Sequence, residues 1–258
     1  MNFDDLDRRM RVFETSHDHC VLPGIWMVAR IDGRSFTRLT KERHQFEAPF
    51  DVRFRDLMVV TVKHLMTCGC YTLFGYTQSD EISLLLHRDE TAFGRKLRKL
   101  TTVLAGEASA AFSLALGDIG AFDARISQLP SEEHVIDYFR WRAEDAARNA
   151  LAAHCHWSLI AEGCSAQEAT RRASGLSTSA KNELLFARGI NFNNLPTWQK
   201  RGTGVVWEQV ESEGFNPATG QTVLTTRRQL RVEYELPMKD GLSDFMRRLL
   251  VKGGTQDE

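Results

Sequence analysis

The chain has 258 residues, of which 42% are apolar and 26% charged, with a formal net charge of −1. These values are ordinary for a folded protein with a sizeable core, and they exclude a uniformly basic nucleic-acid coat protein. The first residues are acidic and mixed, so we expect no secretory signal. No apolar run approaches the roughly 18 residues that span a bilayer. We therefore expect a cytoplasmic protein without a membrane segment.

The cysteines do not form a recognisable metal or disulfide pattern. There are five of them, an odd number, and no C-x-x-C pair occurs. The segments "CGC" at 68–70 and "HCH" at 154–156 lack a second ligand pair at the spacing of a zinc site. We expect reduced thiols in a reducing compartment.

In chain order, the first half alternates between helical and strand-like patterns. Apolar residues at helical spacing predict helices over residues 3–14, 50–66 and 91–116. Short apolar runs predict strands over residues 25–31, 71–76, 82–87 and 122–129. After the N-terminal helix, the order is β-α-β-β-α-β. This order predicts an α+β protein with a ferredoxin-like core, in which two helices cover one face of a mostly antiparallel sheet of about four strands.

The second half is mostly helical and then ends in a hairpin. The pattern predicts one long helix over 131–163, in which Ser131 is the cap, and shorter helices near 166–173 and 181–186. Residues 203–235 alternate around the turn "FNPATGQ", which predicts a C-terminal β-hairpin arm. A short basic helix and a disordered tail complete the prediction. We divide the chain into a core over 1–136 and a second region over 137–258.

Acidic residues meet at one point of this predicted fold. Asp32 follows the first strand in "RIDGRSF", and Asp80 and Glu81 occupy the turn "TQSDE" between the second and third strands. In a split βαβ topology these two points are neighbours. Clustered carboxylates repel one another unless a cation lies between them, and Mg²⁺ prefers such oxygen ligands. Two metal ions about 4 Å apart can activate an attacking hydroxyl and stabilise a leaving pyrophosphate.

Two further features favour a substrate that carries phosphates. Gly33 permits close approach of the backbone to a phosphate. The segment "RKLRK" opens the second helix of the core with Arg95, Lys96 and Lys99, and basic residues there oppose the helix dipole unless an anion docks. Each feature taken alone also has an ordinary interpretation, namely a turn, a solvated hairpin or a solvated basic face.

These segments resemble a known family. The motifs "RIDGRSF", "FGYTQSDEISLLL", "FDARI", "DYFRWRAEDAARN", "AKNELLF", "INFNNLP" and "KRGT" occur in the order seen in the tRNA(His) guanylyltransferase family, over residues 24–207. The core of that family is similar to the palm of ordinary polymerases. Its members add nucleotides to the 5′ end of tRNA, in the 3′–5′ direction, and are similar to one another in forming tetramers.

The resemblance implies roles for individual residues. It implies that the catalytic residues are Asp32, Asp80 and Glu81. It implies that two Mg²⁺ ions bind Asp32, the main-chain carbonyl of Gly33, and Asp80. The residues that it implies for binding the nucleoside triphosphate, GTP or ATP, are Asp32, Gly33, Arg34, Ser35, Phe36, Thr37, Ser79, Asp80, Arg95, Lys96 and Lys99. The residues that it implies for contact with tRNA are Lys181, Asn182, Asn191, Asn194 and Lys200.

Two positions depart from the eukaryotic pattern of the family. Ala48 stands where that pattern has a lysine before proline, and Ala147 stands in place of the histidine of a His-x-Asn triplet. Both family residues are linked to activating the 5′ end or to adding the extra guanylate. Their absence favours the Thg1-like branch, typical of bacteria and archaea, which resembles an enzyme that repairs truncated tRNA 5′ ends.

Two alternatives stay open at the level of the sequence. A palm-type nucleotidyl cyclase needs the same metal ions but no RNA, and the predicted RNA-facing segments after residue 137 argue against it. A non-catalytic RNA-binding chaperone needs no intact carboxylates, and the presence of Asp32, Asp80 and Glu81 argues against it.

Overall fold

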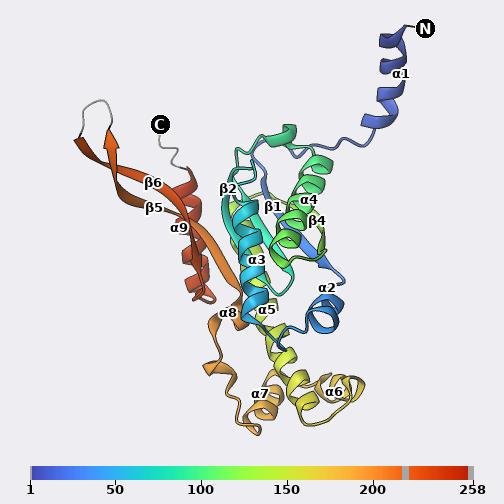
Figure 1. The fold of residues 1–258 in the computed structure, drawn as a ribbon, viewed down its shortest axis with the longest axis vertical. Helices are drawn as coiled ribbons and strands as arrows, with labels where there is room; N and C mark the ends of the chain where they lie inside the picture. The colour runs from blue at the N-terminus through green and yellow to red at the C-terminus, as the bar shows by residue number, and fades with distance from the viewer. Residues whose placement is uncertain (1, 217–220, 255–258) are drawn as a thin grey trace.

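An antiparallel sheet organises the molecule (Figure 1). The computed structural model describes residues 2–216 and 221–254. Within these residues, six strands follow the order β4-β1-β3-β2-β5-β6, and every pairing is antiparallel. The strands are β1 (Trp26–Arg34), β2 (Thr72–Gln78), β3 (Glu81–Leu86), β4 (Ala121–Leu129), β5 (Thr203–Asn216) and β6 (Gln221–Glu233). The predicted α+β class is confirmed, and the sheet is larger than the predicted four strands because β5 pairs with β2.

The helices also follow the prediction closely. They are α1 (Phe3–Thr15), α2 (Phe36–Arg38), α3 (Val52–Leu65), α4 (Leu97–Leu116), α5 (Glu132–Ala161), α6 (Ala166–Ala173), α7 (Thr178–Phe186), α8 (Thr197–Arg201) and α9 (Asp240–Gly254). One predicted start is wrong: α4 begins at Leu97 and not at residue 91. Phe93 and Gly94 have φ values of 55° and 60°, and this left-handed backbone separates a short 3₁₀ turn from the helix.

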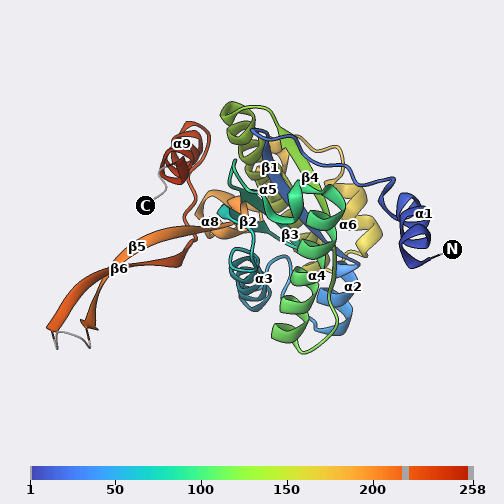
Figure 2. The same cartoon turned by 90° about the horizontal axis from the view of Figure 1, so that it is seen from above.

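Strand β1 is buried on both faces, because helices cover both sides of the sheet. Met27, Ala29 and Ile31 pack into the core under α3 and α4, as predicted for two helices on one face. Trp26 and Val28 point to the opposite face, where α5 and α9 pack. Figure 2 shows α5 and α9 on the other side of the sheet from α3 and α4. This alternation follows from the period of two in a strand.

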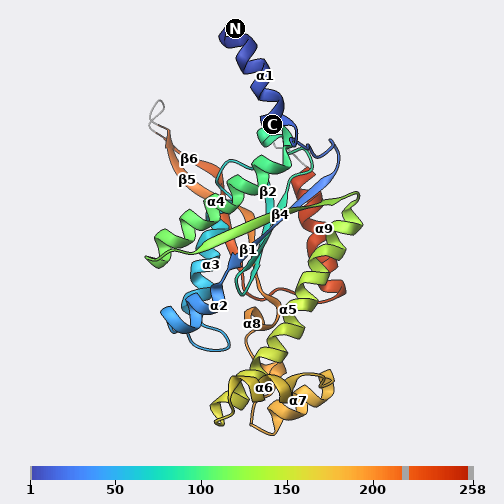
Figure 3. The same cartoon turned by 90° about the vertical axis from the view of Figure 1, so that its right-hand side faces the viewer.

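The long helix α5 connects the sheet to a small helical region. Its first half packs on the sheet, and its second half contributes Leu151, Cys155 and Leu159 to a separate core with α6 and α7. Figure 3 shows α5 passing from the sheet to these two helices. All five cysteines are free thiols. No helix in the described part of the chain has the length and apolar character needed to cross a bilayer.

Two elements project from the body of the molecule. The hairpin of β5 and β6 forms the predicted arm, and α1 extends from the opposite side (Figure 1). None of the residues of α1 is buried, and Phe3 and Phe13 are exposed. The predicted turn at 215–221 falls mostly on residues 217–220, and the predicted disordered tail includes 255–258. Both of these stretches lie outside the described residues.

Candidate active site

The register of the sheet brings the predicted carboxylates together. Asp32 in β1 lies directly opposite Glu81 in β3. The main-chain N–H of Gly33 donates to the carbonyl of Asp80 at 3.0 Å. The end of the first strand therefore touches the turn between the second and third strands, as the sequence predicts.

Asp32 lies in a row of charged side chains on the face that α5 covers. Directly opposed residues in antiparallel strands point to the same face, and Asp32 pairs with Asp123 of β4 on its other side. The next row places Arg30 opposite Arg125. Arg125 Nη2 lies 2.7 Å from Asp32 Oδ2, and Arg30 Nε lies 3.3 Å from the same oxygen. The carboxylate of Asp32 is thus held between two guanidinium groups.

Glu81 is bound by arginines on two sides. Arg142 of α5 donates from Nε and Nη2 to the two oxygens of Glu81, both at 2.6 Å. Arg30 Nη2 lies 2.6 Å from Glu81 Oε2. Burial raises the pKa of Glu81, and the hydrogen bonds and charge of Arg142 oppose this shift. Because its oxygens are engaged in this way, Glu81 is placed to fix the turn and the arginines around it.

Asp80 sits at the tip of the turn, where two cavities meet. Burial raises the pKa of its carboxyl group, and the nearby charge of Asp32 acts in the same direction, while a hydrogen bond from Ser79 opposes them. Ser79 has a φ of 52°, in the left-handed region, which turns the chain tightly before Asp80. Asp80, Ser79, Gln78, Phe50 and Pro49 line both cavities.

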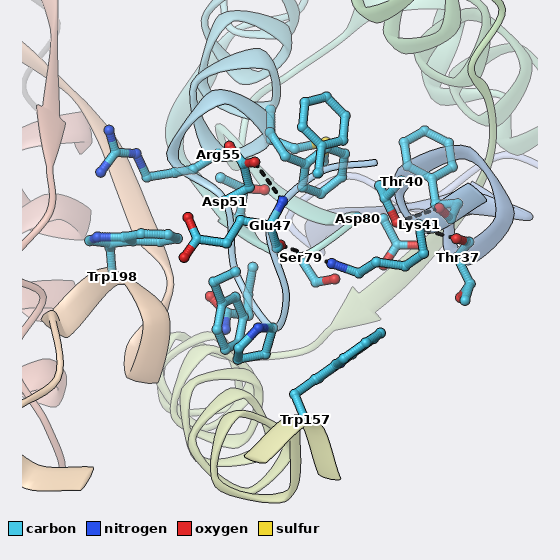
Figure 4. A pocket seen from close by; sticks show the side chains of 18 of the residues that line it. Thr37, Thr40, Lys41, Glu47, Asp51, Arg55, Ser79, Asp80, Trp157 and Trp198 are labelled. Carbon is cyan, nitrogen blue, oxygen red and sulfur yellow. Dashed lines mark hydrogen bonds between the residues drawn. The ribbon is translucent and has the colours of Figure 1, made fainter. Parts of the chain in front are cut away.

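The cavity on the side of α2 and α3 has a volume of about 310 Å³. Figure 4 shows Lys41 reaching into it toward Glu47 and Ser79, with Trp157 and Trp198 also lining it. Lys41 Nζ donates to the carbonyl of Glu47 at 3.0 Å, and its burial lowers its pKa. This size, together with aromatic walls and many polar side chains in the lining, suits a small polar molecule.

The second cavity, of about 340 Å³, lies on the side of α5. Its lining includes Asp32 and Glu81 from the sheet, Asp80 from the turn between β2 and β3, and Arg142 and Asn149 from α5. The two cavities are therefore arranged on either side of the Ser79–Asp80 turn. A ligand in either cavity can reach Asp80, whereas only a ligand in the second cavity can reach Asp32 as well.

Gly33 is required by a close contact with an aromatic ring. A Cβ atom at Gly33 would lie 2.5 Å from Cδ2 of Phe36. Phe36 is buried, and its ring centroid lies 5.0 Å from that of Phe112 and 4.9 Å from that of Phe122, so it has no room to move. The packing of Phe36 thus shapes the end of β1 and the turn into α2.

We predict that Gly33→Ala destabilises the fold by about 1–3 kcal/mol, because the methyl group overpacks the site, and that it weakens nucleotide binding. Chemical denaturation and a nucleotide titration measure the two effects. Gly106→Ala is the matched control, because a Cβ there meets nothing within 4 Å and it lies inside α4. That control should stabilise the chain by about 0.5–1 kcal/mol. Equal effects at the two glycines would contradict the proposed role of Phe36.

The oxygen atoms at this point fit a divalent cation. Asp32 and Asp80 supply two carboxylates, and the carbonyl of Gly33 is a third hard donor. Among the described residues, no group of three or more His, Cys, Asp or Glu side chains forms a complete metal centre. Mg²⁺ commonly uses one or two carboxylates and completes its shell with phosphates and water. The donor set therefore suits Mg²⁺ that arrives with a nucleotide, and not a closed structural site.

The basic cluster does not join this site within one chain. Helix α4 has 20 residues and is therefore about 30 Å long. Its far end leads into β4, which pairs with Arg34, so Arg95, Lys96 and Lys99 lie at the opposite end of the sheet from Asp32. Arg95 is also 7% exposed and donates to four main-chain carbonyls. Within one chain these three residues therefore lie far from Asp32, and their predicted role in binding the triphosphate stays a prediction.

The residues predicted to face RNA lie beyond the carboxylate end of the sheet, on α7, α8 and the segment between them. Gln78, next to Ser79, donates to the carbonyl of Gln199 at 2.8 Å and so connects α8 to the site. Lys200 is buried and donates to the carbonyl of Asn193 at 2.6 Å. Its side chain therefore braces this segment, and its predicted contact with RNA stays a prediction.

The other four predicted RNA contacts are placed differently. Asn191 and Asn194 are exposed, whereas Lys181 and Asn182 are half-buried on α7. Asn182 Nδ2 donates to the carbonyl of Thr178 at 2.8 Å. The exposed asparagines therefore remain the most accessible members of the predicted set.

Several site residues were not predicted from the sequence. Arg30 could have been found, because it is two residues before Asp32 in a strand and must share its face. Arg125 and Arg142 could not, since their positions depend on the register with β4 and on the packing of α5. The aromatic lining of the first cavity, Trp157 and Trp198, comes from separate helices and has no local signal.

Comparison with known proteins identifies the chain's relatives. Residues 7–130 match the family model described as tRNAHis guanylyltransferase, and residues 133–239 match the model described as Thg1 C terminal domain. The chain is 34% identical over 203 residues to the "Probable tRNA(His) guanylyltransferase" of Drosophila melanogaster, covering 75% of this chain and 71% of the relative. It is 32% identical over 236 residues to the tRNA(His) guanylyltransferase of Debaryomyces hansenii, covering 86% of each protein.

The fold agrees with this relationship. A solved structure of a bacterial tRNA(His) guanylyltransferase (Thg1)-like protein in complex with GTP superposes with a TM-score of 0.72 and 25% identity. The superposition covers 96% of this chain and 99% of that chain. Sequence, family model and fold therefore agree over nearly the whole length, and the chain belongs to the tRNA(His) guanylyltransferase family.

Proposed function

We propose that this protein is a metal-dependent 3′–5′ nucleotidyltransferase that adds nucleotides to the 5′ end of tRNA and uses GTP and ATP as substrates. The observation that carries the proposal is that Asp32 and Asp80 meet at the end of β1 and line one cavity together, while Asp80 also lines a second cavity. The names of the relatives and the GTP complex of a solved family structure support the same reaction class.

The topology supports a polymerase-palm core of ferredoxin-like type. The four core strands have the order β4-β1-β3-β2, with α3 and α4 on one face, as a split βαβ unit requires. The carboxylates stand at the end of central β1 and in the adjoining turn. A palm uses this point of the sheet to present metal-bound phosphates, and we propose the same use here.

In this proposal the chain's own residues have separate tasks. Asp32, Asp80 and the carbonyl of Gly33 would hold two Mg²⁺ ions, which would supply activation of the attacking hydroxyl and stabilisation of the leaving pyrophosphate. Ser79 and the backbone of residues 33–37 would hold the triphosphate near these carboxylates. Glu81 acts through its contacts with Arg142 and Arg30, which fix the turn on which Asp80 lies.

The proposed reaction joins the 3′-oxygen of the incoming nucleotide to the activated 5′ phosphorus of tRNA. When the tRNA carries a 5′-triphosphate, the bond from that phosphorus to pyrophosphate breaks. When a 5′-monophosphate end has first been activated by ATP or GTP, the bond that breaks is the one to the nucleoside monophosphate. Ala48 and Ala147 stand where the eukaryotic pattern has a lysine and a histidine. We therefore favour repair of truncated 5′ ends over addition of the extra guanylate to tRNA(His).

The surroundings of the site support contact with RNA on the side of α5, α7 and α8. The proposal keeps Lys181, Asn182, Asn191 and Asn194 as tRNA contacts. It also includes a homotetramer, for which the exposed apolar residues of α1 offer a contact surface, and a cytoplasmic location. The division at residue 136 stays a prediction, because α5 and α9 pack on the same sheet as the core.

The test is incubation of the purified protein with Mg²⁺, labelled GTP and ATP, and a tRNA that lacks its first 5′ nucleotide. The products are resolved at single-nucleotide length, with a parallel reaction without RNA. Extension that restores pairing supports the proposal. A cyclic product or dinucleotide from the triphosphates alone would favour the cyclase, and bound tRNA without any product would favour the chaperone.

A further inference from the structure

A series of side chains with alternating charge crosses the sheet, passes through Asp32 and ends at Asp123. Each member contacts the next: Arg142 Nη2 lies 3.3 Å from Asp145, and Arg30 and Arg125 continue the series on the sheet. The members in order are Asp145, Arg142, Glu81, Arg30, Asp32, Arg125 and Asp123. Each negative charge in the middle of the series is shared by two arginines.

The first and last arginines of this series differ in the exposure of their side chains. The side chain of Arg142 is 8% exposed, whereas that of Arg125 is 58% exposed. Arg125 holds Asp32 by a single nitrogen, Nη2, at 2.7 Å from Oδ2, and its contact with Asp123 is longer, at 3.4 Å. Exposed ion pairs of this kind contribute little to stability. Arg125 is therefore the member of the series that can most readily change partner.

We propose that Arg125 is a phosphate-binding residue of this site, and that it leaves Asp32 when a divalent cation binds there. The inference rests on the proposed function. A cation held by Asp32 and Asp80 would compete with the guanidinium of Arg125 for the carboxylate of Asp32, whose Oδ2 lies 2.7 Å from Arg125 Nη2. The positive charges of the cation and of the Arg125 guanidinium would also repel each other if both stayed at Asp32.

After the exchange, Asp123 keeps the guanidinium close to the site. Asp123 lies beside Asp32 across the β1–β4 pair, so a small movement of Arg125 suffices. A released guanidinium has a planar set of donors that matches phosphate oxygens. The phosphate is either part of the nucleoside triphosphate or the 5′ phosphate of the RNA. Metal binding would thus prepare the site for its anionic substrate.

The experiment compares wild type with Arg125→Gln at low ionic strength. Free Mn²⁺ is titrated by electron paramagnetic resonance, and binding of GTP and of a 5′-phosphorylated RNA duplex is then measured at saturating Mn²⁺. We expect Mn²⁺ alone to bind the variant about two- to five-fold more tightly, because a competitor is lost. We expect one of the two phosphate ligands to bind about ten-fold more weakly, which identifies the source of the phosphate.

The control is Arg247→Gln, which removes an equally exposed arginine from an ion pair on α9, at 62% exposure. It should change neither titration. If Arg125→Gln leaves Mn²⁺ binding unchanged, or weakens the binding of Mn²⁺ and both phosphate ligands together, the inference is overturned. Asp80→Asn is measured alongside. If Mn²⁺ still binds that variant with wild-type affinity, the metal site of the proposed function fails, and this inference fails with it.

Discussion

Asp80→Asn is expected to abolish nucleotide addition and, at the same time, to raise the thermal stability of the protein. Loss of a carboxylate that positions metal-bound phosphates should lower the rate of addition by at least about 10²-fold. The fold should not suffer, because asparagine keeps an oxygen that can accept the hydrogen bond from Ser79. The two effects have opposite signs, and this separates a functional role from a structural one.

The sign of the stability change follows from the pKa of Asp80. Burial raises this pKa in the folded state, so the folded chain binds the proton more tightly than the unfolded chain does. The contribution of Asp80 to the free energy of unfolding is therefore greatest at low pH, and it falls as the pH rises through the folded-state pKa. At neutral pH the ionised carboxylate destabilises the fold, and asparagine removes that effect.

The measurement is a melting curve at pH 7 without divalent ions, together with the rate of extension of a truncated tRNA. A single stabilising substitution commonly adds about 0.5–2 kcal/mol, and we expect a gain in this range when the buried charge is removed. For a chain of this size, each kcal/mol corresponds to roughly 2–4 °C. Asp244→Asn, an exposed acid on α9, is the control and should change neither quantity. A variant of Asp80 that melts earlier, or that keeps more than a few per cent of the activity, would contradict this role.

Arg142→Ala is expected to destabilise the fold by about 3 kcal/mol, which lowers the melting temperature by roughly 6–12 °C. Arg142 is largely buried and binds Glu81 through two hydrogen bonds of 2.6 Å. Removing it leaves a largely buried carboxylate with Arg30 as its remaining partner. The loss of unfolding free energy arises mainly from that poorly compensated charge. The turn that carries Asp80 is also held less firmly. Activity should therefore fall as well.

Arg148 provides the matched control for Arg142. It lies on the same helix and reaches the same Asp145 at 3.5 Å, but its side chain is 79% exposed. Arg148→Ala should change stability by less than about 0.5 kcal/mol. Denaturant unfolding gives the free energy of unfolding of both variants. Each variant loses one positive charge, so the comparison isolates the effect of burial. Similar losses for both would show that the contact between Arg142 and Glu81 does not fix the turn.

The arrangement of the core could be predicted from sequence because its signals are local. Helical spacing over residues 50–66 and apolar runs around "TQSDE" give the order of elements, and this order alone predicts that Asp32 lies beside Asp80. The long helix after Ser131 and the hairpin after Thr203 were also evident from their patterns. Apolar spacing predicts the start of α4 too early, because the left-handed backbone at Phe93 does not change that spacing.

The electrostatics of the site could not be predicted in the same way. The partners of Asp32 and Glu81 come from β4 and α5, and only the register and the helix packing bring Arg125 and Arg142 to them. A basic segment such as "RKLRK" looks like an anion site in sequence, yet in the structure Arg95 binds main-chain carbonyls at the far end of the sheet. A sequence shows which side chains are charged, but it does not show which groups they contact in the folded protein.

The most direct test of the central claim is a metal-rescue measurement during 5′ addition. The substrate is a 5′-triphosphorylated, truncated tRNA in which one non-bridging oxygen of the reacting phosphorus is replaced by sulfur. Mg²⁺ binds sulfur poorly, whereas softer Mn²⁺ or Cd²⁺ accepts it. We predict that one sulfur diastereomer slows addition about ten-fold or more in Mg²⁺ and that Mn²⁺ or Cd²⁺ restores the rate. Equal rates for oxygen and sulfur substrates in Mg²⁺, or a sulfur effect that no metal relieves, would contradict a metal held by Asp32 and Asp80 at the reacting phosphate.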